Sequence, residues 1–395
     1  MTESVRPTTA WRAAFAGTLA MSMGIGPFAV NAVSALSPMV VPDLGLTRTE
    51  LGTLATLTFA VAAGATWIGG RQADRFPGRS MLFGVFAVGG AAAAVMAGAP
   101  SLAWLWVGAV LGGVSQAVAN PVTNQLIADH IPPGARGTQI GVKQSGVQMA
   151  QAVIGLTLPP LALVVGWRGA MLVGPVFAAL GFLAVRGVVP RGHSRGAANG
   201  PSGKAPLGAM VWWLTVYIFT VGLTVQMVVV YTPLYSFEQV GLSAGVAGTA
   251  AGVLGAAGMG GRILWSRMAE RWETPVGALG ALALLAAAAA LLILAAEHRA
   301  TWMLWPGLVV FGISALAVNG VVMLTVVRNA GTGRTGRASG MVGLGFYLGF
   351  MIGPVTFGAL VDRTGSYTLG WTLVVVLCSL AAAMMGVWWR VSDGR

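Results

Sequence analysis

Long apolar stretches separated by short turns run along almost the whole chain, and they constrain its fold more than any motif. A bilayer core needs about 20 apolar residues per helix, and twelve segments have this length when the chain is divided at its charged or Gly- and Pro-rich turns. Hydrophobic residues make up 56% of the 395 positions and charged residues 9%, which excludes a water-soluble globular protein. We predict an all-α polytopic membrane protein with twelve transmembrane helices. Their approximate limits are 11–41, 50–70, 80–98, 102–128, 137–165, 169–189, 207–236, 242–265, 275–295, 301–328, 336–360 and 367–390.

One long polar stretch interrupts this pattern at residues 190–206, PRGHSRGAANGPSGKAP. It is rich in Gly, Ser, Ala and basic residues, a composition typical of a flexible linker. Six apolar segments precede it and six follow it. The sequence therefore predicts an N-terminal six-helix bundle over residues 1–189, a linker over 190–206 and a C-terminal six-helix bundle over 207–395.

Basic residues are distributed unequally between the two sides of the predicted membrane. Eighteen of the 23 Lys and Arg residues lie on one side, Lys143 lies inside a segment, and Arg48, Arg168, Arg299 and Arg363 lie on the other side. By the positive-inside rule, both termini and the linker are cytoplasmic in a multi-pass protein of the cell membrane. The net charge of +12 is then a topology signal, and we expect no nucleic-acid partner. Residues Trp11–Val41 are too long for a signal-peptide core, so we expect no cleaved leader.

The two halves resemble each other in sequence at four places that occur in the same order. Because parallel repeats related by an axis along the membrane normal are typical of one large transporter architecture, we expect a pseudo-two-fold axis with a cavity between the halves. The matching pairs are NAVSALSP (31–38) with QMVVVYTP (226–233), GGRQADRFPGR with WSRMAERWETP, Asn120 with Asn319, and Gly137, Gly141 and Gly146 with Gly336, Gly340 and Gly345.

At this point the chain resembles the major facilitator superfamily over nearly its whole length, and within it the organic-anion, monocarboxylate and cyanate-type bacterial branches. The loop after the second segment is similar to the superfamily signature Gly-x-x-x-Asp-Arg-x-Gly-Arg, with Pro77 as one extra residue in the spacing. The resemblance implies a conformational latch that pairs when the cytoplasmic side is closed. The alternative is an ordinary basic loop. The latch candidates are Gly70, Asp74, Arg75, Gly78 and Arg79, with a weaker copy at Glu270 and Arg271.

Polar side chains within the apolar segments define a candidate inner wall. Segments 80–98, 169–189, 275–295 and 367–390 carry almost nothing that forms hydrogen bonds, so we expect them to face lipid. Segment 102–128 carries polar residues on one helix face, and those of segment 137–165 fall within about half the helix circumference. The inner-wall candidates are Gln116, Asn120, Thr123, Asn124, Gln139, Lys143, Gln144, Gln148, Gln151, Asn31, Tyr217, Gln226, Tyr231, Tyr235, Asn319 and Tyr347.

Lys143 lies in helix-forming sequence with no acidic residue in the same segment, and all 11 acidic residues of the chain fall at segment ends or in loops. An ionisable group inside a bilayer is costly and marks a functional site. Its expected partner is a dipole, water or an anionic substrate. A gate residue that meets helix-end carbonyls, or a neutral amine that carries a proton, are the alternatives.

Arg262 is the second cation within a segment, in GMGGRILWSRMAER. Its spacing resembles that of an arginine associated with the substrate carboxylate in the monocarboxylate and oxalate/formate branches. The alternative is an arginine that snorkels from the last turns of the helix to the interface.

These observations predict a secondary transporter that moves a small organic anion of mono- or dicarboxylate type by alternating access. The alternative is a multidrug or hydrophobic-compound exporter, which the 18 Met and 14 Trp residues favour; against it, the intramembrane Arg and the glycine-rich antiporter pattern of drug exporters are missing. Import or export, and proton symport or uniport, stay open. The candidate substrate-binding residues are Lys143, Arg262, Asn31, Asn120, Gln148, Gln226, Asn319 and Tyr347.

We expect no enzymatic activity, because the sequence has no phosphate-loop lysine, no HExxH and no nucleophile elbow. The three histidines lie at loop positions and Cys378 is the one cysteine, so we expect neither a metal site nor a cofactor. A membrane enzyme or a sensor built on a transporter fold are the alternatives from other classes. The expected partners are a small-molecule substrate, a proton if transport is coupled, and the lipid bilayer, with the chain acting as a monomer.

Overall fold

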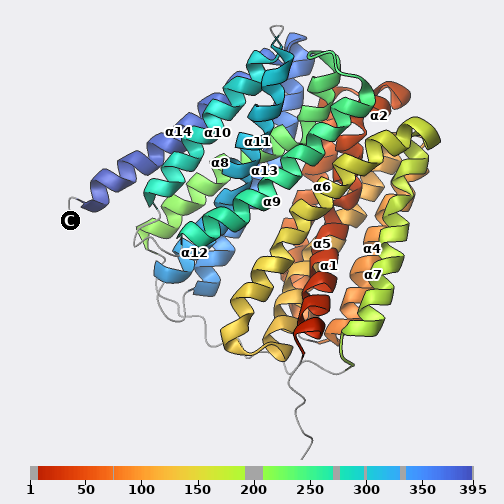
Figure 1. The fold of residues 1–395 in the computed structure, drawn as a ribbon, viewed down its shortest axis with the longest axis vertical. Helices are drawn as coiled ribbons and strands as arrows, with labels where there is room; N and C mark the ends of the chain where they lie inside the picture. The colour runs from red at the N-terminus through yellow and green to blue at the C-terminus, as the bar shows by residue number, and fades with distance from the viewer. Residues whose placement is uncertain are drawn as a thin grey trace, which may run out of the picture.

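The computed structural model describes residues 8–73, 75–191, 208–269, 276–297, 300–329 and 335–393, and within these ranges all regular structure is helical (Figure 1). The helices are α1 (Thr9–Ala35), α2 (Ser37–Leu44), α3 (Arg48–Ala73), α4 (Gly78–Ala97), α5 (Leu102–His130), α6 (Pro133–Met171), α7 (Val173–Val188), α8 (Ala209–Glu238), α9 (Ala244–Ala269), α10 (Val276–Ala295), η1 (Thr301–Met303), α11 (Leu304–Ser314), η2 (Ala315–Ala317), α12 (Val318–Asn329), α13 (Thr335–Thr364) and α14 (Thr368–Asp393).

Each predicted segment corresponds to helical structure. Among the described residues, nine helical stretches are long and apolar enough to cross a membrane, and α7 is a shorter apolar helix. The two remaining helices, α3 and α9, are 26 residues long, which exceeds the roughly 20 residues that a bilayer requires. The predicted all-α polytopic membrane fold with twelve spans is confirmed.

Two spans are interrupted where the sequence predicted continuous helices. The first divides into α1 and α2 at Leu36, because Pro38 has no N–H to donate to the preceding turn and stands at the start of the new helix. The tenth contains the 3₁₀ turn η2 between α11 and α12, where Ser314 has a ψ of −76°. Conversely, α6 runs through the predicted turn near residue 166, and its helical path breaks there only at Gly166, which has a φ of 74°.

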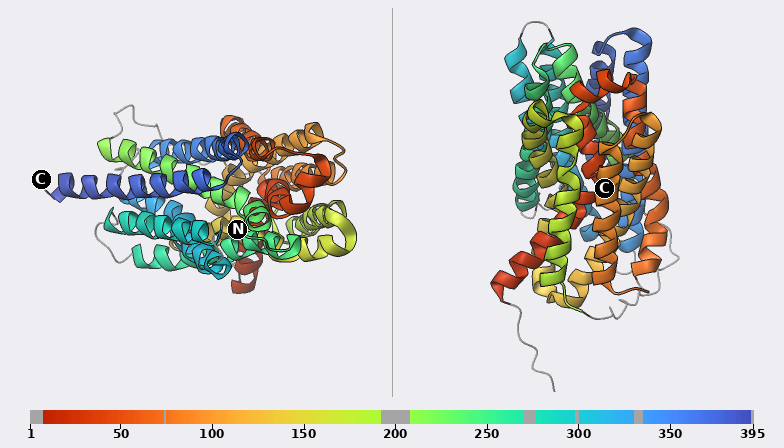
Figure 2. Two further views of the ribbon diagram at one scale, coloured as in Figure 1. Left: turned by 90° about the horizontal axis from the view of Figure 1, so that it is seen from above. Right: turned by 90° about the vertical axis from the view of Figure 1, so that its right-hand side faces the viewer.

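The helices pack as two groups. Helix α1 contacts α4, α5, α6 and α7, whereas α8 contacts α9, α13 and α14, and the views in Figures 1 and 2 show the early, warm-coloured helices beside the later, green and blue ones. Across the groups, the main contacts are α3 with α13 and α6 with α9. The sequence repeat relates the second span to the eighth and the fifth to the eleventh, so a two-fold axis exchanges these two contacts. The domain boundaries at 189 and 207 stay a prediction, and residues 192–207 lie outside the described ranges.

Glycines allow the two groups to approach closely. At the α6–α9 crossing, a Cβ added to Gly155 would lie 2.0 Å from the backbone nitrogen of Gly252. At the α3–α13 crossing, a Cβ added to Gly52 would lie 2.7 Å from the carbonyl oxygen of Pro354. Small residues at such positions permit backbone-to-backbone packing between membrane helices.

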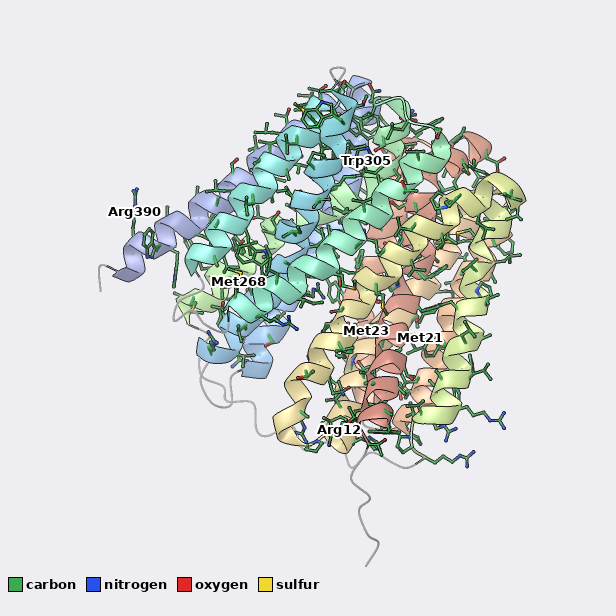
Figure 3. The ribbon with its side chains drawn as sticks, in the orientation of Figure 1. Arg12, Met21, Met23, Met268, Trp305 and Arg390 are labelled. Carbon is green, nitrogen blue, oxygen red and sulfur yellow. The ribbon has the colours of Figure 1, made fainter. Side chains whose placement is uncertain are left out.

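The two ends of the molecule differ in how the groups meet. Arg12 lies at one end, which we call the linker end because α7, the last helix before the linker, ends there, and Trp305 lies toward the opposite end (Figures 1 and 3). Gly141 lies toward the linker end on the same face of α6 as Gly155, and Gly340 lies toward it on the same face of α13 as Pro354, because each pair is 14 residues, about four helical turns, apart. A Cβ added at Gly141 or Gly340 would meet no described atom within 4 Å. The groups are therefore in contact at the end opposite the linker and apart at the linker end.

Polar contacts connect the groups at this closed end. Arg48 forms an ion pair with Glu238 at 2.7 Å, and the Tyr367 hydroxyl donates to the same carboxylate at 2.7 Å. The backbone N–H groups of Arg48 and Thr49 donate to the carboxylate of Asp362 at 3.0 and 2.7 Å. We call Arg48, Thr49, Glu238, Asp362 and Tyr367 the closed-end cluster. It places a carboxylate from α13 at the N-terminus of α3, where a helix has unpaired N–H groups.

Candidate functional site

The Lys143 side chain is fully buried and held by the predicted polar face of α5. Its Nζ donates to Asn120 Oδ1 at 2.8 Å, to Thr123 Oγ1 at 2.9 Å and to Asn124 Oδ1 at 2.6 Å. These three residues lie on one face of α5 because their spacing is three and four residues. An ammonium has three donors, and each has an acceptor here, so the cation is satisfied by neutral oxygens.

This arrangement, which we call the lysine cage, leaves the charge of Lys143 without a negative counterpart. None of the carboxylates in the described ranges forms an ion pair with it. A charge interacts more strongly in a low-dielectric interior than in water. Asn124 is exposed and Asn120 is half-buried, so the positive potential of the cage extends to the surface that these two amides share.

Arg262 of α9 reaches across to the other group of helices. Its Nη1 donates to the backbone carbonyl of Gln144 in α6 at 2.8 Å, its Nη2 approaches the carbonyl of Leu316 in η2 at 3.5 Å, and its Nε has no partner in the described structure. Gln144 directly follows Lys143 in α6, so Arg262 binds the backbone of the residue next to the other predicted cation. Helix α9 continues for seven residues beyond Arg262, which is about 10 Å of rise. The guanidinium bonds to carbonyls of α6 and η2 and not to the end of its own helix, so these contacts do not favour an arginine that snorkels to the interface.

The other candidate binding residues occupy different parts of the interior. Gln148 is buried with an unpaired Oε1, and Asn319 has an unpaired Oδ1. Tyr347 of α13 stacks on Phe59 of α3 in the other group, with ring centroids 6.1 Å apart. Asn31 and Gln226 are buried in α1 and α8, and in the described structure neither bonds to Lys143 or Arg262.

Two phenols that the pattern assigned to the inner wall lie elsewhere. The Tyr217 hydroxyl donates to the carbonyl of Leu279 at 2.8 Å, and that of Tyr235 lies 2.9 Å from the carbonyl of Ile293. Both acceptors belong to α10, so these tyrosines join helices within one group. The expectation was wrong for them because a buried hydroxyl can be satisfied by a neighbouring backbone carbonyl without facing a cavity. Tyr231 does reach the other group, where its hydroxyl lies 2.6 Å from the carbonyl of Arg48.

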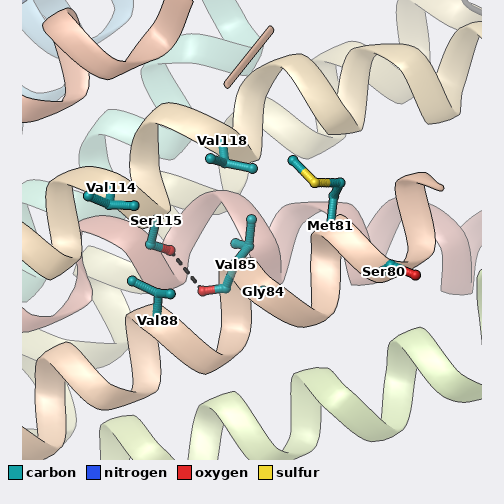
Figure 4. Close-up of a pocket in the computed structure, with 8 residues that line it drawn as sticks. All are labelled: Ser80, Met81, Gly84, Val85, Val88, Val114, Ser115 and Val118. Atoms are coloured by element: carbon teal, nitrogen blue, oxygen red, sulfur yellow. Dashed lines mark hydrogen bonds between the residues drawn. The ribbon is translucent and has the colours of Figure 1, made fainter. Parts of the chain in front are cut away.

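An apolar groove of about 190 Å³ lies between α4 and α5 (Figure 4). Its α5 residues include Val114 and Val118, which at 100° per residue point about 135° and about 175° away from the polar face of α5. Ser115 Oγ turns inward and donates to the carbonyl of Val85 at 2.9 Å. The groove therefore faces away from the lysine cage and is separate from the candidate site.

The predicted latch is described only in part, because Asp74, Glu270 and Arg271 lie outside the described residues. Gly70 lies in α3 and Gly78 begins α4, while Arg75 is exposed in the turn between them. Arg79 donates to the carbonyl of Arg186 at 2.8 Å and lies over the Phe83 ring. This contact joins the latch loop to the end of α7.

The closed-end cluster was not predicted as a site. Its residues fall at or near helix ends far apart in the sequence, and no periodicity relates Arg48 to Glu238 or Asp362. One local signal was present: Thr47 and Glu50 form a reciprocal capping box, with Thr47 N donating to Glu50 Oε2 at 2.8 Å and Glu50 N to Thr47 Oγ1 at 3.1 Å. That signal marks the start of α3 but not its partner in the other group.

The sequence matches one known protein family over most of its length. The model of the Major Facilitator Superfamily matches residues 13–354. The chain belongs to the major facilitator superfamily. Its resemblance to this family, first suggested by the loop after the second span, is thus confirmed, and its role is transport across a membrane.

Three proteins with similar sequences are named as transporters. A probable sulfoacetate transporter from Cupriavidus necator is 25% identical over 391 residues, which cover 89% of this chain and 87% of that protein. An uncharacterized MFS-type transporter from Mycobacterium tuberculosis is 27% identical over 91% of this chain and 81% of its own length. A hexuronate transporter from Bacillus subtilis is 25% identical over 160 residues, 40% of this chain and 38% of that one.

Solved structures share the fold at low identity. A bacterial homolog of the human lysosomal transporter Spinster, in an inward-facing and occupied conformation, aligns with a TM-score of 0.77 at 17% identity over 97% of this chain and 98% of that one. A point mutant of the nucleoside transporter NupG aligns with a TM-score of 0.75 at 12% identity over 95% of this chain and 99% of that one.

Proposed function

We propose that this protein is a secondary transporter that moves a small organic anion, of mono- or dicarboxylate type, across the cell membrane by alternating access. The observation that carries the proposal is the pair of cations on neighbouring helices: Lys143 and Arg262 bond only to neutral oxygens within the described structure. Two membrane-embedded positive charges without a carboxylate favour a solute that brings the negative charge. The names of two relatives, transporters of sulfoacetate and of hexuronate, support an acidic solute.

The conformation supports alternating access. The groups of helices touch through the closed-end cluster and separate toward the linker end. We place the linker end, with both termini, in the cytoplasm because eighteen of the 23 basic residues lie on that side. In that orientation the structure is the inward-open state, and the latch loop, with Asp74, Arg75 and Arg79, stabilises the outward-open state.

The proposed roles divide between charge and orientation. Lys143 and Arg262 supply the positive potential, and the polar candidates Asn31, Asn120, Gln148, Gln226, Asn319 and Tyr347 orient the solute. The transporter acts as a monomer, since each chain contains both groups of helices. Either an accompanying proton or the solute gradient alone drives the flux.

Uptake into proteoliposomes tests the proposal. Radiolabelled mono- and dicarboxylates and a cationic dye are supplied to vesicles that contain the parent, Lys143→Gln or Arg262→Gln, with and without a pH gradient. We expect the parent to take up at least one anion and both variants to lose most of that uptake. Uptake of the dye but of no anion would show that the protein is an exporter of hydrophobic compounds.

A further inference from the structure

We infer that the transported anion carries hydroxyl groups close to its acidic group, and that Gln148, Asn319 and Arg262 recognise this combination together. The inference rests on the proposed function, because it assigns a solute class to the same site. It starts from polar atoms that the protein buries without pairing them.

Three such atoms belong to residues grouped around the Arg262 guanidinium. Arg262 Nε is an unpaired donor, while Gln148 Oε1 and Asn319 Oδ1 are unpaired acceptors. A buried polar atom without a partner is costly, and native proteins pair almost all of them. A group of three at one place therefore indicates that a molecule other than the protein completes the hydrogen bonds.

The backbone contacts of Arg262 locate the other two residues. Its Nη1 binds the carbonyl of Gln144, and in an α-helix the carbonyl of residue 144 pairs with the N–H of residue 148. The guanidinium therefore touches the turn of α6 that carries Gln148. Its Nη2 approaches the carbonyl of Leu316, three residues before Asn319. Arg262 is thus within about one helical turn of both amides, one in each group of helices.

The helix break in the tenth span supplies the second, independent observation. Helix α11 ends at Ser314, the 3₁₀ turn η2 covers Ala315–Ala317, and α12 begins at Val318. A 3₁₀ turn within a helix often marks a functional position, and interrupted helices near the repeat interface form the solute sites of many transporters. This break lies directly before Asn319 and contains the carbonyl that Arg262 approaches.

The types of the unpaired atoms specify the ligand. The Nε–H of an arginine donates, so its partner is an acceptor, and a carboxylate or sulfonate oxygen forms the stronger, charge-assisted bond. An amide side chain presents an acceptor oxygen and a donor NH2 group, and a hydroxyl group, which both donates and accepts, pairs with it without adding positive charge. A hydroxylated organic acid presents both kinds of group within a few bonds of each other.

Binding of matched anions to purified protein in detergent tests the inference. The probes are propionate with lactate, and succinate with malate and tartrate, which differ within each set only by hydroxyl groups. A site whose buried polar atoms pair with a hydroxyl rejects the analogue that lacks it. We therefore expect the unmutated protein to bind the best hydroxylated anion about tenfold or more tightly than the corresponding acid without hydroxyl groups.

Variants assign that preference to the two amides. Gln148→Leu and Asn319→Leu should each reduce the preference to about threefold or less, because each weakens the hydroxylated acid more than the unhydroxylated one. Gln125→Leu is the matched control: Gln125 is 9% exposed beside 7% for Gln148, and both of its amide atoms are unpaired, but it projects from the side of α5 away from the lysine cage. This control should keep the full preference.

The outcomes separate the inference from the proposed function. Equal binding of hydroxylated and unhydroxylated acids by the parent overturns the inference and leaves anion transport standing; this comparison needs no variant to fold. A preference that survives in both Leu variants overturns the assignment to Gln148 and Asn319. Failure of the parent to bind any anion while it binds the cationic dye overturns the proposed function, and the inference with it.

Discussion

At the residue scale, the lysine cage shows how a membrane protein keeps a cation without a carboxylate. Asn120, Thr123 and Asn124 satisfy all three donors of Lys143, yet contribute no negative charge. The three side-chain oxygens take the place of water around the Lys143 ammonium and stabilise its charged form. Because they are neutral, they leave the positive potential of the ammonium to act on a solute. A carboxylate partner in the same place would cancel that potential, and with it the attraction for an anionic solute.

The Lys143→Gln variant should lose affinity for the transported anion by about 5- to 150-fold, which corresponds to about 1–3 kcal/mol for a hydrogen bond to a charged group. Glutamine retains hydrogen bonding but removes the cation. Equilibrium binding in detergent measures the effect, with a neutral solute of the same size as the control. Parental affinity for the anion in Lys143→Gln would contradict the role of Lys143.

Lys143→Arg should recover little of the lost affinity. The cage fits a compact ammonium with three donors, whereas a guanidinium is planar and has five donors in a fixed fork. We expect this variant to bind the anion more weakly than the parent at matched folding, as judged by its thermal unfolding in detergent. Full recovery by arginine would show that the site requires charge alone.

At the element scale, the crossing of α6 and α9 depends on the absence of side chains. Gly155 and Gly252 bring the two backbones so close that no Cβ fits between them. Because this crossing holds Gln144 beside Arg262, the packing of small residues positions the polar contact. The same helices separate beyond it toward the linker end.

Gly155→Ala should therefore destabilise the protein by about 1–3 kcal/mol, the usual cost of overpacking a close contact. Thermal unfolding in detergent provides the measurement. Gly260→Ala is the matched control, because a Cβ at Gly260 of α9 meets no described atom within 4 Å. Equal unfolding temperatures for the two variants would show that the crossing can widen without cost.

Sequence patterns predicted the helices and the polar face of α5, but not the contacts between helix ends that are far apart in the sequence. Periodicity on a single helix placed Asn120, Thr123 and Asn124 together, because a regular helix fixes which side chains share a face. Pairing of Arg48 with Glu238 depends instead on how two groups of helices meet in one conformation. The break at η2 was missed for a related reason: Ala315–Ala317 contain no proline or glycine, so the turn comes from packing and not from a local signal.

At the scale of the whole molecule, the closed-end cluster holds the two groups of helices together on one side of the membrane. Its bonds run between α3 and the ends of α8 and α13. Opening that end exposes the N-terminus of α3 and removes the Asp362 carboxylate that accepts from its N–H groups. The capping box of Thr47 and Glu50 remains, because both residues belong to the same group of helices. The cluster therefore favours the observed state over its opposite.

Asp362→Ala should shift the equilibrium toward the state that is open at this end by about fivefold, given about 1 kcal/mol for the loss of a helix cap. A cysteine introduced by Ser34→Cys reports the opening, because Ser34 is buried where α1 meets the carbonyls of Val229 and Val230. Its labelling by an impermeant maleimide should be about fivefold faster in the Asp362→Ala background, with Cys378 replaced by Ser throughout.

Asp43→Ala is the control for this experiment. Asp43 pairs with Arg168 at 2.8 Å, and both residues belong to the same group of helices, so its loss should leave labelling unchanged. Hydrogen bonds from Arg168 and Trp167 hold the pKa of Asp43 below its usual value. Its stabilising contribution is therefore present above an unfolded pKa of about 3.9 and is lost only as the pH falls through the lower folded pKa, well below the pH of labelling. Equal rates for Asp362→Ala and Asp43→Ala would contradict the role of the cluster.

Asp74→Asn should slow turnover while substrate binding stays close to that of the parent. In the proposed mechanism the latch loop stabilises one conformation and does not line the pocket, so the substitution should change the populations of the two states and not the contacts with the solute. Transport rate at matched expression, measured beside binding in detergent, separates the two effects. Comparable turnover in mutant and parent would count against a latch at this loop.

The composition of the lysine cage also bears on whether the site binds anions or cations. Without its ammonium, the cage would retain three side-chain oxygens converging from one helix, which is the kind of ligand set that hard metal cations prefer. Truncation of Lys143 would thus turn a site that repels sodium into one that coordinates it. In the proposed mechanism Arg262 would then be the remaining membrane-embedded cation, so one substitution would both weaken the attraction for an anion and create a set of oxygen ligands for a cation.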